Sequence, residues 1–488
     1  MRHSLRLYRA EQVRELDRLA IEEHGIPGYL LMNRAGARVF ATLRARWPEA
    51  RAITVCCGGG NNGGDGYVVA RLAAEAGLGV QLIALKDPAL LTGDAARAAR
   101  DWQAGEGRVE EMNERLRGDV IVDALLGTGL DRPAGGDYAR LIEHVNSSSR
   151  PVVAVDVPSG LNADTGMPLG PCVRADTTVS FIGLKRGLYT GQAGRWCGDV
   201  VFDDLDTPPA IHDALVADGV LLEPADLGNW LEPRAPDTHK GDLGHVLVIG
   251  GDHGMAGAVV LAGTAALRAG SGLVSLATRS AHAALAIAGQ PELMAHGVED
   301  LEAFDRLLAR ADVLALGPGL GQSEWSKALW QRAVKADKPI VMDADALNLL
   351  VDHDFTAETL ILTPHPGEAA RLLGCAVDDV QNDRFAAVRE LANRFQAVVV
   401  LKGHGSLIAD PAGRLAVCAR GNPAMATAGM GDALTGIIAS FCGQGLENFD
   451  AACCGVLAHA LAGDQAARGR RQILASDLIA SLDRVLPE

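Results

Sequence analysis

Short apolar runs that end in glycine, asparagine or aspartate recur along the chain and constrain its fold more than any other feature. In the first half, residues 53–57 run into a glycine-rich segment, residues 80–85 form another run, and residues 120–122 and 152–155 each run into an aspartate. Their apolar residues are continuous rather than alternating, and segments with helical spacing separate them, which is typical of parallel strands buried on both faces. The pattern predicts a parallel sheet covered by helices, with ligands at the carboxyl ends of the strands.

The same pattern starts afresh after a region rich in proline and aspartate. Five further strands are predicted there, and each ends in a polar or glycine motif: residues 246–251, 313–321, 339–345, 360–368 and 398–405. We therefore predict two α/β domains, over residues 1–212 and 239–488, with a linker region over residues 213–238. A length of 488 residues fits this number of domains.

The composition argues against several classes of partner. Lys and Arg number 45 and Asp and Glu number 61, so the formal net charge is −16, which disfavours binding to nucleic acid or to an anionic membrane surface. No charge-free apolar stretch approaches the roughly 18–20 residues of a membrane span, and charges interrupt the apolar residues at the N-terminus, unlike in a signal peptide. Nine cysteines without a CxxC motif indicate reduced, buried, structural thiols. We therefore expect a cytoplasmic protein.

The segment GGGNNGGDG, residues 58–66, lies between a predicted strand and a predicted helix. It contains the spacing GxGxxG, which by itself is a weak signal and is also compatible with a tight glycine turn. The side chains of Asn61, Asn62 and Asp65 stand beside the free backbone amides of a helix start, and this combination suits a phosphate or ribose contact. Both interpretations stay open on this segment alone.

Two more strand ends contribute polar side chains. Asp123 follows one strand, and Asp156 and Ser159 follow the next. A single aspartate in such a position commonly caps a helix. Together with Asn62, these residues offer neutral and anionic oxygens, which suit a hard or weakly hydrated cation, and the sequence has no histidine or cysteine cluster of the kind that binds zinc.

In the second half, ATAGMGDALTG, residues 426–436, is the most informative segment. Gly429 and Gly431 precede a predicted helix, and Asp432 lies in its first turn. Free backbone amides there form an anion hole, and Asp432 is placed to act as a base on a hydroxyl group that faces a phosphate. The alternative is a glycine-rich cap in which the aspartate only complements the helix dipole.

Other loops after predicted strands have two interpretations each. In KGHGS, residues 402–406, the small residues would let a nucleotide approach the backbone; the alternative is that Lys402 is a surface residue at the end of a strand. His365, between two prolines in TPHPGE, is either structural or functional, and the glycines of residues 254–258 and 317–321 suit a flat ligand or tight helix–strand packing. No Walker A lysine motif is present, which excludes a P-loop.

Taken together, the motifs resemble a known family. The N-terminal motifs GGGNNGGDG, DALLGTGL and VDVPSGLNADTG resemble the NAD(P)H-hydrate epimerase domain. The C-terminal motifs HKGDLGHVLVIGG, GPGLG, DADALNLL, TPHPGE, KGHGSLI and GNPAMATAGMGDALTG resemble the ADP-dependent NAD(P)H-hydrate dehydratase domain. The resemblance covers nearly the whole chain, in the order found in the fused bacterial repair enzymes. It implies an α/β protein with an N-terminal Rossmann-like three-layer sandwich and a C-terminal ribokinase-like domain.

One departure is Ala424, where the family usually has glycine; its methyl group could narrow the loop.

For the N-terminal domain, the resemblance implies epimerisation of the R and S forms of NADH or NADPH hydrate (NADHX, NADPHX) at C6 of the altered ring. Ring opening or transient loss of the hydroxyl group would be assisted by a carboxylate such as Asp156 or Asp123. Potassium would be bound by Asn62, Asp123 and Ser159. The residues implied to bind this substrate are Asn61, Asn62, Gly63, Gly64, Asp65, Gly127, Thr128, Gly129, Leu130, Asp131, Arg132, Pro133, Tyr138 and Asp156.

For the C-terminal domain, the resemblance implies dehydration of the S form to NADH or NADPH at the expense of ADP, which gives AMP and phosphate. Asp432 would deprotonate the C6 hydroxyl group as it attacks the β-phosphoryl group, with Mg²⁺ on the nucleotide. The implied hydrate-binding residues are Ala258, Gly319, His365 and Asp432, and the implied ADP-binding residues are Lys402, Gly403, His404, Gly405, Ser406 and Gly431. The family also suggests a homo-oligomer.

A second hypothesis is a ribokinase-like small-molecule kinase joined to a Rossmann-like binding domain without catalysis. The C-terminal half alone permits it, because the GMGD segment suits phosphoryl transfer to many hydroxyl groups. The presence of Asn62, Asp123, Asp156 and Ser159 together favours an active site in the N-terminal half.

Overall fold

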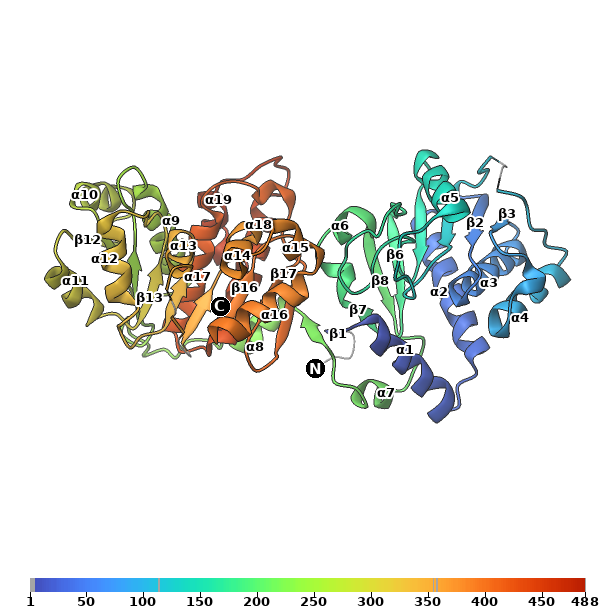
Figure 1. Cartoon of the computed structure of the whole chain (residues 1–488), viewed down its shortest axis with the longest axis horizontal. Helices are drawn as coiled ribbons and strands as arrows, with labels where there is room; N and C mark the ends of the chain where they lie inside the picture. Colours follow the sequence, from blue (N-terminus) through green and yellow to red (C-terminus); the bar gives the residue numbers. More distant parts are fainter. Residues whose placement is uncertain (1–4, 113–114, 354, 357–358, 488) are drawn as a thin grey trace. The chain divides into compact units, whose positions relative to one another are not determined.

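Figure 1 shows the computed structural model of the chain, which describes residues 5–112, 115–353, 355–356 and 359–487. The chain divides into two compact units, Met1–Val220 and Leu221–Glu488. This boundary falls inside the region predicted as a linker, where the structure forms strand β9 (Gly219–Leu221) and the short helices η5 (Pro224–Asp226) and α8 (Leu227–Trp230). Every helix among the described residues is too short or too polar to span a bilayer.

The N-terminal unit is built on a six-stranded sheet in the order β3-β2-β4-β5-β6-β8. All neighbouring strands run parallel. Their bounds are Ala52–Cys57 for β2, Gly79–Ala84 for β3, Val120–Ala124 for β4, Val152–Val155 for β5, Thr177–Phe181 for β6 and Asp199–Asp203 for β8. The parallel sheet predicted from the apolar runs is thus confirmed.

Helices cover both faces of this sheet. On one face, α2 (Gly28–Arg46) and α3 (Asn61–Glu75) pack over the strands, and α4 (Gly93–Ala104) packs on α3. On the other face lies α5 (Gly136–Ser147). Successive strand residues point to opposite faces, so Val55 packs with the first group of helices and Cys56 with α5. The result is the predicted three-layer sandwich.

Two short strands outside the six-stranded sheet position the first helix of the N-terminal unit. Strand β1 (Arg6–Tyr8) pairs in parallel with β7 (Leu184–Lys185), and α1 (Ala10–Arg18) follows β1 directly. Strands β1, β6, β7, β8 and β9 were not predicted. For β6 and β7 the reason is that β6 consists largely of buried Thr and Ser, and β7 has only two residues.

The C-terminal unit contains a sheet in the order β12-β11-β10-β13-β14-β15-β16-β17-β18. The strands are parallel from β12 to β16, and β17 and β18 add an antiparallel edge. The strand bounds are His245–Ile249 for β10, Leu273–Thr278 for β11, Met294–Gly297 for β12, Val313–Leu316 for β13, Ile340–Met342 for β14, Leu360–Leu362 for β15, Val398–Leu401 for β16, Ser406–Ala409 for β17 and Leu415–Cys418 for β18.

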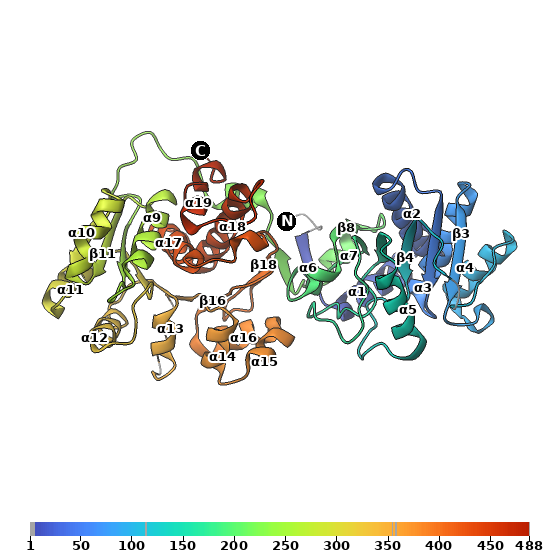
Figure 2. The ribbon, with the colours of Figure 1, turned by 90° about the horizontal axis from the view of Figure 1, so that it is seen from above.

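Helices again form layers on both sides of the sheet, as Figure 2 shows. One layer contains α9 (Ala256–Arg268), α17 (Met430–Gly443) and α18 (Asn448–Ala466). The other contains α12 (Glu324–Ala333), α13 (Asp345–Leu350), α14 (Pro366–Leu373) and α16 (Arg384–Phe395). All five strands predicted in this half are present, whereas β11, β12, β17 and β18 were not predicted.

Candidate active sites

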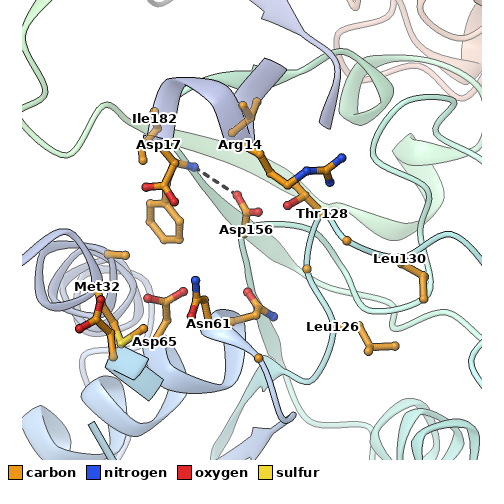
Figure 3. Close-up of a pocket in the computed structure, with 18 of the residues that line it drawn as sticks. Arg14, Asp17, Met32, Asn61, Asp65, Leu126, Thr128, Leu130, Asp156 and Ile182 are labelled. Carbon is orange, nitrogen blue, oxygen red and sulfur yellow. Dashed lines mark hydrogen bonds between the residues drawn. The ribbon is translucent and has the colours of Figure 1, made fainter. Parts of the chain in front are cut away.

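The N-terminal sheet has a topological switch point between β2 and β4. The chain leaves β2 for β3 on one side and returns to β4 on the other, which opens a crevice at the carboxyl ends of these strands. The loops after β2, β4 and β5 meet there around a cavity of about 690 Å³, shown in Figure 3. Side chains of α1 also line the cavity.

Most of the predicted N-terminal site residues line this cavity. They are Asn61, Asn62, Asp65, Gly127, Thr128, Gly129, Leu130, Asp131, Arg132, Tyr138 and Asp156. Gly63 and Gly64 lie buried within α3, where a Cβ atom on Gly63 would be 2.1 Å from the carbonyl oxygen of Gly58. These two glycines permit close packing of the loop, and Pro133 is not among the lining residues.

Asp123 and Ser159 form a closed hydrogen-bonded pair. Asp123 is fully buried and is the last but one residue of β4, whereas the sequence predicted it directly after the strand. The Ser159 hydroxyl donates to Oδ1 of Asp123 at 2.6 Å, and the Ser159 backbone N–H donates to Oδ2 at 2.8 Å. Burial raises the pKa of Asp123 to about 6, although the hydrogen bonds from Ser159 oppose this rise.

Asn62, the third residue predicted for the cation site, has an unsatisfied amide group. Its Nδ2 atom is buried without a hydrogen-bond partner among the described residues. A Cβ atom on Gly127 would lie 3.3 Å from the Asn62 amide carbon, so the glycine leaves room for this side chain. Because an amide can present either its nitrogen or its oxygen, Asn62 has a free position to offer a ligand or a cation.

Lys185 is a cavity residue that the sequence did not reveal. Its side chain is 1% exposed, and its ammonium group donates to the carboxylate of Asp156, to the carbonyl oxygen of Phe181 at 2.8 Å and to the hydroxyl of Ser180 at 3.2 Å. Figure 3 marks the bond to Asp156 with a dashed line. Asp156, with a φ of 67°, leaves β5 in a left-handed conformation that directs the loop to the cavity. The available signal was the pair of basic residues, Lys185 and Arg186, in the segment GLKRGL.

The C-terminal sheet has its own switch point, between β10 and β13. The chain runs from β10 to β11 on one side and later to β13 on the other. The loops after these strands are joined by a hydrogen bond of 2.7 Å from the N–H of Asp252 to the carbonyl of Gly319. Gly319 has a φ of 57°, and a Cβ atom on it would lie 3.1 Å from that of Ala258. The predicted residues Ala258 and Gly319 therefore lie side by side.

A buried network surrounds Lys402 at the end of β16. Its ammonium group donates to Oδ1 of Asp343 at 2.6 Å and lies 3.8 Å from Oε2 of Glu368. Thr435 of α17 donates to Oδ2 of Asp343 at 3.0 Å. Burial alone would lower the pKa of Lys402, but the charges of Asp343 and Glu368 outweigh it and raise the pKa. Asp343 and Glu368 belong to the motifs DADALNLL and TPHPGE, but the sequence did not predict a role for either residue.

The start of α17 faces this network. Gly429 takes a left-handed φ of 89°, and a Cβ atom on Gly431 would lie 3.1 Å from Oδ2 of Asp343 and 3.3 Å from Nζ of Lys402. Asp432 lies in the first turn of α17, as predicted. Burial raises its pKa to about 6, with a further contribution from Asp343 and an opposing one from Lys402. A carboxylate with such a pKa is suited to act as a base near neutral pH.

His365 has a structural task in addition to any contact with a ligand. It caps α14, because its Nδ1 atom accepts hydrogen bonds from the backbone N–H groups of Gly367 at 3.0 Å and Glu368 at 3.3 Å. Its Nε2 atom lies 3.4 Å from Oε1 of Glu368, which connects it to the network of Lys402.

The local geometry of two further predicted features, the loop of residues 403–406 and Ala424, is also defined. In the loop of residues 403–406, Gly403 and His404 are exposed and the Ser406 hydroxyl donates to the carbonyl of Gly403 at 3.1 Å. Ala424 is buried and is not among the described residues with positive φ, so its methyl group causes no left-handed strain. Among the described residues, no group of three His, Cys, Asp or Glu side chains is arranged to hold a metal ion.

Comparison with known proteins identifies the family. The family model described as YjeF-related protein N-terminus matches residues 28–187, and the model described as NAD(P)H-hydrate dehydratase matches residues 246–484. The chain is 49% identical over 484 residues to the bifunctional NAD(P)H-hydrate repair enzyme Nnr of Coxiella burnetii, with 98% of this chain and 99% of that protein covered. The chain belongs to the bifunctional NAD(P)H-hydrate repair enzymes.

Other members of this repair-enzyme family align over similar lengths. The bifunctional NAD(P)H-hydrate repair enzyme Nnr of Escherichia coli is 44% identical over 485 residues, with 98% of this chain and 93% of that protein covered. A solved structure of a ribokinase-like superfamily protein from Enterococcus faecalis is 27% identical, covers 56% of this chain and 96% of that chain, and has a TM-score of 0.53. The predicted ribokinase-like fold is confirmed.

Proposed function

We propose that the chain repairs hydrated nicotinamide cofactors in two steps, with one activity in each unit. An epimerase domain over residues 1–212 interconverts the R and S forms of NAD(P)H hydrate, and a dehydratase domain over residues 239–488 converts the S form to NAD(P)H. The observation that carries this proposal is the presence of a separate polar site at a switch point in each unit of a chain that aligns over 98% of its length with a bifunctional repair enzyme.

In the epimerase site, the cavity of about 690 Å³ holds the hydrated dinucleotide. The backbone of residues 61–65 and of residues 127–133 binds its phosphate and ribose groups, since these loops follow parallel strands and end at a helix start. Asp156 lies beside the altered ring, and Lys185 fixes its orientation. Tyr138 lines the same cavity.

Potassium fits the group formed by Asn62, Asp123 and Ser159. The test is chemical: rotation of the Asn62 amide turns its oxygen to the buried position that Nδ2 occupies without a partner, and Asp123 brings a buried carboxyl group. Oxygen ligands from an amide, a carboxylate and a hydroxyl suit a hard cation. When bound, the cation supplies positive charge that favours an ionised Asp123 and orders the two loops.

In the dehydratase site, Lys402, the loop of residues 403–406 and Gly431 bind ADP, and Ala258, Gly319 and His365 bind the hydrate. Asp432 takes the proton of the C6 hydroxyl group as that oxygen attacks the β-phosphoryl group, which releases AMP. Loss of the resulting phosphate from C6 and of a proton from C5 restores the C5=C6 double bond of the reduced ring, and it is favoured because phosphate is a better leaving group than hydroxide. Lys402 lies next to Asp343 and Glu368, where its charge can also meet the phosphate oxygens.

Magnesium enters this site with the nucleotide. Mg²⁺ is commonly bound through substrate phosphates, waters and one or two carboxylates, so it needs no preformed cluster of three ligands. Asp343, Glu368 and Asp432 are the carboxylates of the Lys402 network and offer such a position. The ion supplies charge neutralisation of the phosphoryl oxygens.

The deciding experiment follows the near-ultraviolet absorbance of reduced nicotinamide, which its hydrate lacks. The full chain is mixed with both epimers of NADH hydrate, ADP, magnesium and potassium. Full recovery of absorbance, abolished by Asp432→Ala, supports both activities, whereas recovery that stops at about half contradicts the epimerase. No recovery with ADP or ATP contradicts the repair function and favours the small-molecule kinase.

The cellular setting is also a proposal. All nine cysteines are free, and seven of them are buried, whereas Cys375 is exposed and departs from the buried thiols expected. Reduced thiols and a substrate made from NADH or NADPH support a cytoplasmic location. The homo-oligomer suggested by the family is tested by light scattering of the purified chain.

A further inference from the structure

Two carboxyl groups in the N-terminal cavity have no partner within the described part of the protein. Asp17, on α1, and Asp65, on α3, both line the cavity. Neither side chain makes a hydrogen bond or an ion pair with another described residue. Figure 3 shows Asp17, Asp65 and Asp156 facing the same space. Half-buried carboxyl groups without partners are costly, and they persist where a ligand or a proton satisfies them.

The charges around these two groups do not balance. Burial raises the pKa of Asp17, and the charge of Asp156 raises it further, while Lys185 opposes the rise. Burial also raises the pKa of Asp65 well above its usual range, with Asp156 and Asp17 adding to it and Lys185 opposing. Lys185 is the basic group that lowers the pKa of both carboxyl groups, and it is already bonded to Asp156, while Asp94 raises the pKa of Asp17 as well. The other charged residues that line the cavity are Arg14, Lys86, Asp94, Asp131 and Arg132.

We propose that Asp17 and Asp65 together retain one proton, carried by one or the other carboxyl group, and donate it to the C6 hydroxyl group of the hydrated nicotinamide. This inference rests on the proposed epimerase function and assigns its acid. The charge of Asp17 raises the pKa of Asp65, so the two groups titrate as a coupled pair, and the acidic form of the pair is the one that can protonate a departing hydroxyl group. The Asp156–Lys185 pair, an ion pair in the structure, is the complementary acceptor.

The reaction then runs as loss and re-addition of water. The pair transfers its proton to the hydroxyl oxygen, the C6–O bond breaks, water leaves, and the lone pair of the ring nitrogen forms a C6=N double bond. Water adds to the opposite face of C6, and the proton it loses enters the Asp156–Lys185 pair. One proton passes from that pair to Asp17 and Asp65, which restores the site. Nothing is consumed, and the configuration at C6 is inverted.

The test compares Asp17→Asn, Asp65→Asn and the double variant in the full chain. Epimerisation is followed without ADP by chromatographic separation of the R and S forms of NADH hydrate. Each single variant is expected to lose about 100-fold or more in kcat, with little change in KM, because a general acid acts in the transition state. The double variant is expected to be no slower than the slower single variant, since the two residues act as a unit. Glu11→Gln, an exposed carboxylate on the same helix, is the matched control.

The pH profile separates an acid from a merely structural residue. Wild-type kcat is expected to fall as the pH rises through the apparent pKa of the pair, because the acidic form is lost. In Asp17→Asn the neighbouring negative charge is gone, so this fall moves to lower pH. Incorporation of ¹⁸O from labelled water at every inversion is expected, and retention of the original oxygen would overturn the proposed step.

The outcomes distinguish this inference from the function on which it rests. A wild-type chain that dehydrates the S form but does not epimerise contradicts the proposed epimerase. A second outcome overturns only the role of Asp17 and Asp65. In it the wild-type chain epimerises, and both single variants are folded by circular dichroism, keep a rate within a factor of about three of the wild-type rate and show an unchanged pH profile.

Discussion

The buried guanidinium group of Arg384 donates a hydrogen bond of 3.1 Å to the backbone carbonyl of Leu401, the last residue of β16. The same nitrogen donates to the carbonyl of Lys402 at 3.3 Å, and the whole side chain is 1% exposed. A Cβ atom on Gly403 would lie 3.0 Å from the other terminal nitrogen of Arg384. The buried guanidinium group of Arg384 therefore holds the backbone at Leu401 and Lys402, where the loop proposed to bind ADP begins.

Replacement of this cation is expected to impair ADP binding selectively. Arg384→Met leaves three backbone carbonyls, those of Leu401, Lys402 and Gly405, without this donor, and each lost hydrogen bond to a charged group costs about 1.5–3 kcal/mol. We expect the KM for ADP to rise about tenfold, which corresponds to about 1.4 kcal/mol, with epimerase activity unchanged. Arg394→Gln, an exposed arginine on the same helix, is the control and should leave the KM unaltered. An unchanged KM in Arg384→Met contradicts the role of the buried arginine.

Gly431→Ala tests the close approach at the start of α17. The added methyl group would lie 3.1 Å from Asp343 and 3.3 Å from Lys402, within the space proposed for phosphate. We expect dehydratase activity to fall about 100-fold, as for other losses of positioned phosphate contacts, while the melting temperature changes little. Gly289→Ala meets no atom within 4 Å and should retain full activity. Comparable activity in both variants would contradict a tight phosphate site.

The pH dependence of the dehydratase should report Asp432. Its pKa is raised to about 6, so the carboxylate that accepts the proton is present above that pH and is lost below it. We therefore expect kcat/KM to fall as the pH drops through about 6. Asp432→Asn should lose about 10²–10⁴-fold in kcat/KM and show no such step. A wild-type profile that is flat across this range would count against Asp432 as the base.

The sequence predicted best those parts of the site that belong to strand ends. Asn62, Thr128 and Asp156 lie in the segments that follow buried apolar runs, and the geometry of a parallel sheet then brings them to one crevice. The confirmed strands were predicted in the same way, because a continuous apolar run can be recognised in the sequence without knowing which strands pair with it. The assigned roles of these residues stay predictions.

The residues that the sequence did not reveal reach the site from elements without such a signal. Asp17 lies on an amphipathic helix beside Leu16 and Leu19, where a charged residue usually indicates a solvated face. Lys185 belongs to a two-residue strand whose pairing with β1 cannot be predicted from local pattern. Arg384 is similar, because its partners lie 17 and 18 residues away in another strand and loop.

Ser159→Ala tests the proposed potassium site. The Ser159 hydroxyl donates to Asp123 and accepts a hydrogen bond of 2.9 Å from the N–H of Leu126, so its loss removes an oxygen ligand and loosens the loop after β4. We expect the half-saturating potassium concentration for epimerisation to rise about tenfold. Ser147→Ala, on α5, should not change it. Epimerisation that is indifferent to potassium in the wild-type chain would contradict the site itself.

For the Lys185–Asp156 pair we predict that a second substitution restores the stability lost in the first without restoring epimerase activity. Lys185→Met leaves the carboxylate of Asp156 without its counter-ion in a largely buried position, and breaking a buried pair from one side costs about 3–5 kcal/mol. Adding Asp156→Asn removes the uncompensated charge, so the double variant should regain most of the lost free energy of unfolding. Calorimetry measures this recovery, while the epimerase assay should find both variants inactive. If the double variant were no more stable than Lys185→Met, the loss would arise from packing of the lysine stem rather than from the ion pair.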